Sequence, residues 1–167
     1  MKLQTAPSEF INLKGIEYFT FEEDFMENNI RCIPMIVRFK MDLAGIKLKL
    51  GEWSRFQPSE RIELALRPVN NRLQISTYRE YLAQLVVRHT GKAATAMLID
   101  EHPQWKDLFG LPPMLREKFA ELKLSISISQ WQRLTNIQRF ALLKLCRPGH
   151  ENKNFPKAVA EFGLLNT

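Results

Sequence analysis

A match between two stretches of the chain at a fixed offset constrains its fold more than any other feature. Sliding the sequence by 78 residues, the difference between positions 53 and 131, places Trp53 on Trp131 and Pro34 on Pro112. The same shift aligns Arg38 with Arg116, Lys40 with Lys118, Arg61 with Arg139, Leu48 with Ile126, and Leu50 with Ile128. A fixed period indicates one supersecondary unit used twice. We therefore expect repeat units at about residues 33–67 and 111–147, packed around a pseudo-two-fold axis. Pro34, Trp53, Pro112 and Trp131 are expected to be structural.

Local signals divide each repeat unit into helix, short strand and helix. Pro34 suits the first turn of a helix, and Gly45 suits its C-terminal stop. Residues 46–50 alternate apolar and basic side chains, and residues 124–128 alternate apolar side chains with serine, which predicts two short strands. Because the backbone groups of a short strand need partners, we expect these two strands to pair with each other.

Further helices are predicted around and after the repeats. Thr77 begins a helix that Gly91 ends, and residues 93–99 form a second short helix, which gives connecting helices at about 77–101. Thr135 with Gln138 makes a capping box for the last helix of the second repeat unit. A C-terminal helix is expected at about 156–163. The predicted fold is mainly α, a single domain over residues 1–167 with an internal repeat of helix–short strand–helix whose two short strands pair.

Composition indicates a soluble globular chain. Of 167 residues, 45% are hydrophobic and 25% are charged, and no apolar run approaches the roughly 20 residues of a membrane span. The first eight residues lack the pattern of a secretory signal, and two cysteines are too few for a disulfide framework. We therefore predict a cytoplasmic protein that does not bind membranes. The net charge of +6 is spread along the chain, which favours a solvated surface and makes nucleic acid an unlikely partner.

No standard catalytic or metal-binding constellation can be found in the sequence. The seven glycines form no phosphate-binding loop, and no zinc motif occurs. Cys146 and His150 would supply only two ligands, so no metal is predicted. Cys32 and His89 are interpreted as packed structural residues rather than as a nucleophile and a base. The expected protein is not an enzyme.

One segment between two predicted helices is a candidate binding site. It contains Arg147, His150, Glu151, Asn152, Lys153 and Asn154. Loops on a rigid scaffold carry function disproportionately, and a following helix N-terminus favours anions. The alternative interpretation is an ordinary solvated turn.

Several strings are distinctive when taken together. They are FEEDF (21–25), RCIPMIVRFK (31–40), GIKLKLGEW (45–53), QRFALLK (138–144), RPGHENKNF (147–155) and EFG (161–163). This combination resembles the nitrate reductase-associated protein family over about residues 17–165. Members of that family are mostly cyanobacterial and lie near genes for nitrate reductase and molybdenum cofactor synthesis. The resemblance implies a role in nitrate assimilation and supplies no catalytic residues.

Three functions are compatible with these observations. The first is a non-catalytic accessory protein whose partner is nitrate reductase or a protein of its maturation or electron-transfer pathway. It would support assembly, cofactor insertion or electron delivery by protein contact, and basic charge would steer it to an acidic partner. The second is a molybdenum-cofactor-binding protein that uses Arg147, His150, Lys153 and Asn154, since phosphate favours basic side chains. The third, a nucleic-acid-binding regulator, rests on net charge alone.

Overall fold

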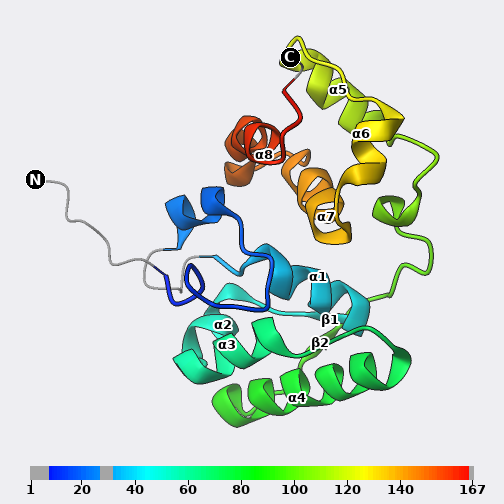
Figure 1. The fold of residues 1–167 in the computed structure, drawn as a ribbon. Helices are drawn as coiled ribbons and strands as arrows, with labels where there is room; N and C mark the ends of the chain where they lie inside the picture. Colours follow the sequence, from blue (N-terminus) through cyan, green and yellow to red (C-terminus); the bar gives the residue numbers. More distant parts are fainter. Residues whose placement is uncertain (1–7, 27–31, 166–167) are drawn as a thin grey trace, which may run out of the picture. The chain divides into compact units, whose positions relative to one another are not determined.

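The computed structural model describes residues 8–26 and 32–165. The chain divides into two compact units, Met1–Asp100 and Glu101–Thr167. Both units are built mainly from helices, which confirms the predicted class (Figure 1). The single domain over residues 1–167 stays a prediction.

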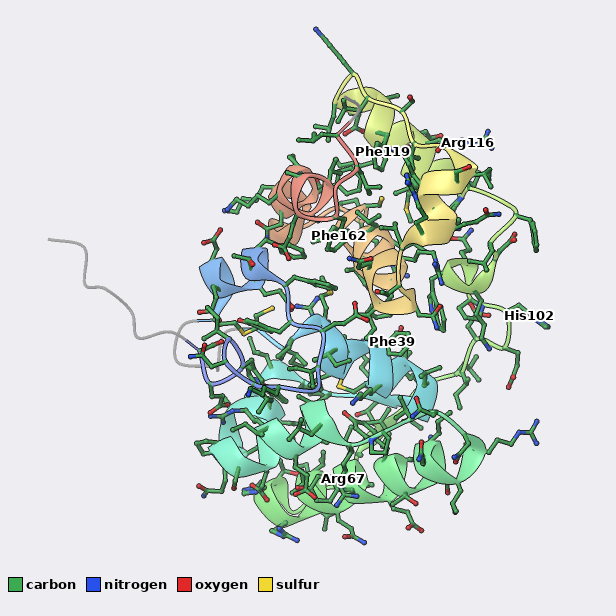
Figure 2. The ribbon with its side chains drawn as sticks, viewed as in Figure 1. Phe39, Arg67, His102, Arg116, Phe119 and Phe162 are labelled. Atoms are coloured by element: carbon green, nitrogen blue, oxygen red, sulfur yellow. The ribbon has the colours of Figure 1, made fainter. Side chains whose placement is uncertain are left out.

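The first unit packs three shorter helices against one long helix. Its elements are η1 (Thr20–Phe25), α1 (Met35–Ala44), β1 (Ile46–Lys47), α2 (Leu50–Arg55), α3 (Pro58–Leu66), α4 (Arg72–Thr90) and β2 (Thr95–Ala96). The long helix α4 contacts α1 and α2. Trp53, Leu64, Tyr78 and Leu82 are almost completely buried, so the core of this unit lies between α4 and the helices of the first repeat unit. Arg67 follows α3, and its guanidinium lies 3.8 Å from the centroid of a tyrosine ring on α4 (Figure 2).

The second unit is centred on α7. Its elements are η3 (Gln104–Lys106), α5 (Pro113–Glu121), α6 (Ile128–Arg133), α7 (Asn136–Leu145), η4 (His150–Asn154) and α8 (Phe155–Glu161). The helix α7 contacts α5, α8, η3 and η4. Phe119 of α5, labelled in Figure 2, meets Phe155 edge-to-face with ring centroids 5.4 Å apart. Leu115, Trp131 and Leu142 are fully buried beside them, so apolar packing holds these helices together.

The helix boundaries follow the offset of the sequence match. Helices α1, α2 and α3 begin at positions 35, 50 and 58, and α5, α6 and α7 begin at positions 113, 128 and 136. The two tryptophans are both fully buried. Arg61 lies over the Trp53 ring at 5.9 Å, and Arg139 lies over the Trp131 ring at 5.8 Å. The internal repeat and the pseudo-two-fold packing of its two units stay predictions.

Two short strands pair, but the predicted partner of residues 46–50 is wrong. Ile46 pairs with Ala96 and Lys47 with Thr95, in antiparallel register. Residues 124–127 form no strand and instead lead into α6, whose N-cap residue Ser127 has an extended backbone and accepts a side-chain hydrogen bond from the backbone N–H of Gln130. The alternation of apolar side chains there reflects this entry into a helix.

Two predicted features of the connecting region are also wrong. The long helix begins at Arg72 rather than near Thr77, because Asn71 accepts from the backbone N–H of Gln74 at 2.9 Å and so caps it earlier. The short helix predicted over 93–99 is absent, because this segment supplies β2 and the backbone partners that β1 needs. The predicted stop at Gly91, with φ 71°, is confirmed. The last helix, α8, begins one residue before its predicted start and ends at Glu161.

A left-handed residue follows the first helix of each repeat unit. Gly45 has φ 71°, and Lys123, at the same offset of 78, has φ 57°. A Cβ atom at position 45 would lie 2.8 Å from Arg79 Nη1 and 2.9 Å from Ile99 Cγ1, so only glycine fits. Lys123 is exposed, and the following backbone N–H, of Leu124, donates to the carbonyl of Phe119 at 3.0 Å. The turn therefore has the hydrogen bond of a helix stop without a glycine.

Lys40 joins the first helix of its repeat unit to the end of the third. Its side chain is only 7% exposed, and its Nζ donates to the carbonyl oxygens of Ala65 and Arg67, each at 2.6 Å. These carbonyls lie at the C-terminal end of α3, where backbone acceptors lack helical partners. Burial lowers the pKa of Lys40 to about 8. The ammonium group is therefore held by helix-end carbonyls at a cost in desolvation.

We expect Lys40 to make the stability of this protein rise with pH. With a pKa near 8 in the folded chain and 10.5 when solvated, the unfolded chain binds more protons between these values. The free energy of unfolding of the native protein, relative to that of Lys40→Met, should rise by about 1–2 kcal/mol from pH 7.5 to 9.5. Urea unfolding at several pH values measures this difference.

The control is Lys92→Met, at an exposed lysine of the same unit. Its unfolding free energy should follow that of the native protein throughout this pH range. A difference between native protein and Lys40→Met that does not change with pH would contradict the assignment.

Candidate functional site

The predicted binding segment, residues 147–154, links α7 to α8 in the second unit. It turns at Gly149, whose φ of 147° lies in a region that glycine adopts readily. Asn152 holds the turn, because its Nδ2 donates to the carbonyl of Arg147 at 3.2 Å and its backbone N–H donates to the carbonyl of Gly149 at 3.2 Å. The turn is therefore fixed by its own polar groups.

The four predicted residues whose side chains the structure describes do not converge on one point. The side chains of Arg147 and Lys153 are exposed, whereas Asn154 is 1% exposed, with its Oδ1 lacking a hydrogen-bond partner among the described residues. The side chains of His150 and Glu151 lie outside the described part of the chain. Within it, the structure brings together only Asn152 and the backbone of Arg147.

Lys118 of α5 is the residue near this segment that the sequence search missed. Its Nζ donates to Asn152 Oδ1 at 2.7 Å and forms an ion pair with Glu121 at 2.8 Å. Lys118 is the counterpart of Lys40 at the offset of 78, and each lysine reaches the chain that follows the third helix of its repeat unit. That match was the only signal in the sequence, because Lys118 and Asn152 are 34 residues apart.

His89, interpreted from the sequence as a packed residue without a carboxylate partner, has one in the structure. Its Nε2 lies 2.7 Å from Glu60 Oε1, and Arg88 Nη1 lies 3.2 Å from Glu60 Oε2. Glu60 also accepts from the backbone N–H of Gln57 at 2.7 Å and so caps α3. Burial acts to raise the pKa of Glu60, but the hydrogen bonds from Gln57 and His89 lower it overall. The pair fastens the C-terminal end of α4 to the start of α3.

A second carboxylate, that of Glu23, accepts hydrogen bonds from residues near the start of the described chain. It accepts from the hydroxyl groups of Ser8 and Tyr18 and, at 3.1 Å, from the backbone N–H of Ser8. Burial raises the pKa of Tyr18, and its hydrogen bond to Glu23 raises it further. The phenol therefore stays protonated and serves as a donor in this cluster.

The two cysteines differ in their surroundings. Cys32 is partly exposed, and its Sγ lies 2.6 Å from Arg38 Nη2 near the start of α1. Cys146 is buried, and burial raises the pKa of its thiol to about 12. Among the described residues, no three or more His, Cys, Asp or Glu side chains lie close enough together to hold a metal ion. In that part of the chain no helix has the length and apolar character needed to cross a membrane.

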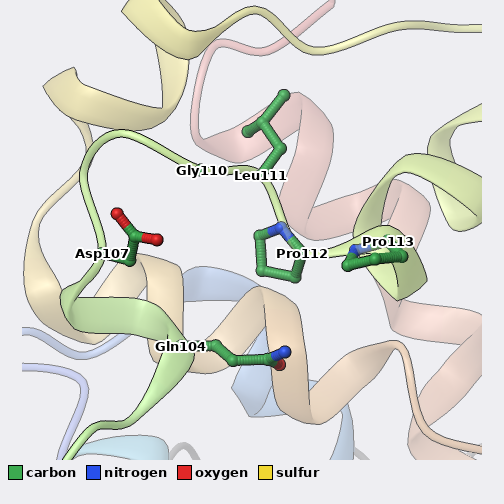
Figure 3. A pocket seen from close by; sticks show the side chains of 6 residues that line it. All are labelled: Gln104, Asp107, Gly110, Leu111, Pro112 and Pro113. Atoms are coloured by element: carbon green, nitrogen blue, oxygen red, sulfur yellow. The ribbon is translucent and has the colours of Figure 1, made fainter.

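A small hollow lies between η3 and the start of α5. Figure 3 shows the six residues that line it, which are Gln104, Asp107, Gly110, Leu111, Pro112 and Pro113. Its volume is about 170 Å³. Typical sites for small molecules have volumes of roughly 300–1,000 Å³, so this hollow is of a size to take a single side chain.

The loop of residues 107–110 borders the hollow and is held at three points. Asp107 Oδ1 accepts from the backbone N–H of Phe109 at 2.9 Å. Trp131 Nε1 donates to the carbonyl of Asp107 at 2.7 Å, and Gln132 Nε2 donates to the carbonyl of Leu108 at 3.0 Å. The side chain of Phe109 is 86% exposed. The loop therefore holds a large aromatic ring in solvent.

We expect the charge of Glu60, beyond its capping bond, to stabilise the first unit. Glu60→Gln keeps an acceptor for the backbone N–H of Gln57 but removes the ion pair with Arg88 and the carboxylate that lies beside His89 Nε2. The free energy of unfolding at pH 7 should fall by about 1 kcal/mol. Because the pKa of Glu60 is lowered on folding, this contribution is present above the usual carboxyl pKa of 4.5. It should disappear as the pH falls through the folded value, which thermal unfolding from pH 7 to pH 3 would measure.

Glu52→Gln is the matched control, because Glu52 caps α2 by the same kind of bond, from the backbone N–H of Lys49 at 2.8 Å. Its effect on unfolding should be smaller at pH 7. An equal loss of stability in both variants would contradict a role for the charge of Glu60.

Comparison with known proteins gives one match. The family model described as conserved nitrate reductase-associated protein matches residues 18–162, which includes α1–α8, the segment after α7 and the loop that carries Phe109. No curated protein and no solved structure matches this chain. With most of its length matched, the chain belongs to the conserved nitrate reductase-associated protein family.

Proposed function

We propose that this protein is a non-catalytic accessory protein of assimilatory nitrate reductase that acts through protein contact. The observation that carries the proposal is the family match over residues 18–162, since the family is described by its association with nitrate reductase. Its partner is nitrate reductase itself or a protein of its maturation or electron-transfer pathway. The contact would support assembly, cofactor insertion or electron delivery.

The way the polar groups are used supports a contact role. Lys40 and Glu60 satisfy helix ends, and Arg139 donates to the carbonyl of Trp105 at 2.7 Å. The large apolar side chain of Phe109 meanwhile stays in solvent and is 86% exposed. An aromatic side chain of this kind is among the residue types that dominate the binding energy of protein interfaces. The net charge of +6 would speed encounter with an acidic partner.

We expect the tagged full-length protein to bind purified assimilatory nitrate reductase of the same organism. Because electrostatic steering assists encounter, association should slow as salt increases. Biolayer interferometry at two salt concentrations measures this. In cells grown on nitrate, deletion of the gene should lower nitrate reductase activity, and the full-length gene should restore it.

Growth on ammonium is the control for the deletion, because nitrate reduction is not needed there. Unchanged reductase activity after deletion, together with no binding of the purified proteins, would contradict the proposed function.

A second candidate function is favoured by the basic groups around residues 147–154. Lys118 reaches Asn152 in this segment, beside the exposed side chains of Arg147 and Lys153. Lysine and arginine are suited to the phosphate of the pterin in the molybdenum cofactor. On this alternative, the protein holds the cofactor for the reductase.

If the cofactor binds there, removing the basic groups should weaken binding. Titration of the protein with molybdopterin released from a molybdoenzyme, followed by fluorescence, gives the affinity. The double variant Arg147→Ser, Lys153→Ser should bind at least tenfold more weakly, whereas Lys123→Ser, at an exposed lysine of the same unit, should bind like the native protein. A flat titration of the native protein would contradict this second function.

A further inference from the structure

Phe109 is an exposed aromatic side chain on a loop whose conformation is fixed by hydrogen bonds. The loop is fixed by the Asp107 carboxylate, by the indole of buried Trp131 and by the Gln132 amide. A phenylalanine ring left in water lacks the favourable free energy that its burial would supply. Polar contacts already hold the loop in this exposed conformation. Little further conformational entropy is therefore lost when a partner binds.

The hollow beside the loop is lined by a polar residue, Asp107, of the same loop that carries the apolar ring of Phe109. Asp107 faces it together with Gln104 and Gly110 (Figure 3). A Cβ atom at position 110 would lie 2.8 Å from Asp107 Oδ2, so glycine gives the carboxylate its room. Oδ1 of Asp107 accepts from the backbone N–H of Phe109, and Oδ2 lies beside Gly110, which lines the hollow together with Asp107.

Charge decides which side chain the hollow suits. The second unit, residues 101–167, has ten lysines and arginines against six aspartates and glutamates. Asp107 is therefore a local negative group in a basic unit, and an anion would meet it unfavourably. A lysine or arginine of the partner would gain an ion pair there and fits a hollow of about 170 Å³.

We propose that the loop of residues 107–110 is a docking element for a protein partner. Phe109 enters an apolar pocket of that partner, and a basic side chain at the rim of the pocket enters the hollow and pairs with Asp107. Aromatic side chains set in a partner's pocket are typical of the residues that dominate binding energy. This inference rests on the proposed function and names the surface that carries it, with nitrate reductase as the partner to be tested.

Two substitutions test the contributions of Phe109 and Asp107 to binding separately. Phe109→Ala removes the ring, and Asp107→Asn removes the charge while keeping an acceptor for the backbone N–H of Phe109. Leu98→Ala is the matched control, because Leu98 is 95% exposed and lies in the first unit. Purified full-length variants are titrated against purified nitrate reductase by isothermal calorimetry, and thermal unfolding of each variant is measured alongside.

The docking element predicts a distinct pattern across these variants. Phe109→Ala should raise the Kd at least tenfold, Asp107→Asn should raise it several-fold at low salt and less at high salt, and Leu98→Ala should change it less than twofold. Phe109→Ala should keep the unfolding temperature of the native protein, because the ring has no packing to lose.

Three results would overturn the inference. A Phe109→Ala variant that binds like the native protein overturns the docking element and leaves the proposed function standing. A large loss of unfolding temperature in Phe109→Ala overturns it as well, because the ring would then pack within the chain. Absence of any binding by the native protein removes the proposed function, and the docking element with it.

Discussion

Each compact unit is organised around a buried guanidinium that lies over a buried tryptophan ring. A buried arginine is strongly unfavourable unless its N–H groups find acceptors. Arg61 donates to the carbonyl of Phe56 at 2.6 Å and pairs with Glu9 at 3.1 Å. Arg139 donates to the carbonyls of Trp105 and Leu134 and to the Asn136 side chain. These bonds fix the turn between the second and third helices of each repeat unit.

The exposed loop depends on the same interaction in the second unit. Arg139 holds η3 through the carbonyl of Trp105 and lies over the ring of Trp131. Trp131 in turn donates its indole N–H to the carbonyl of Asp107. A chain of contacts therefore runs from a buried cation to the base of the loop that carries Phe109. This arrangement would suit a protein-contact role, because the loop is joined by hydrogen bonds to the buried core of its unit.

Features that depend on a few neighbouring residues could be predicted from the sequence. The Thr135 capping box forms as expected, with the backbone N–H of Gln138 donating to Thr135 at 3.2 Å. Gly45 and Gly91 end α1 and α4, because both adopt positive φ values that other residues avoid. The segment after α7 turns at Gly149 and continues as η4 into α8, and the four predicted side chains that the structure describes there do not converge on one point.

Features that depend on distant residues could not be predicted in this way. Residues 124–128 show the same alternation as a strand, but only the folded chain shows that they lead into α6 while β2 takes their place beside β1. Glu60 and His89 are 29 residues apart, and nothing local links them. Phe109 gave no signal, because a single aromatic residue in a loop is usually buried, and its exposure follows from the contacts of Trp131 and Gln132.

The left-handed turns at Gly45 and Lys123 occupy corresponding positions, although the two residues are of different types. Position 45 is enclosed by Arg79 and Ile99, so every side chain larger than hydrogen is excluded there. Position 123 faces solvent, so a lysine accepts the left-handed backbone at a penalty of roughly 1–2 kcal/mol and without collision. A substitution at either position would therefore meet different neighbours. A pattern search that requires glycine would find the first turn and pass over the second.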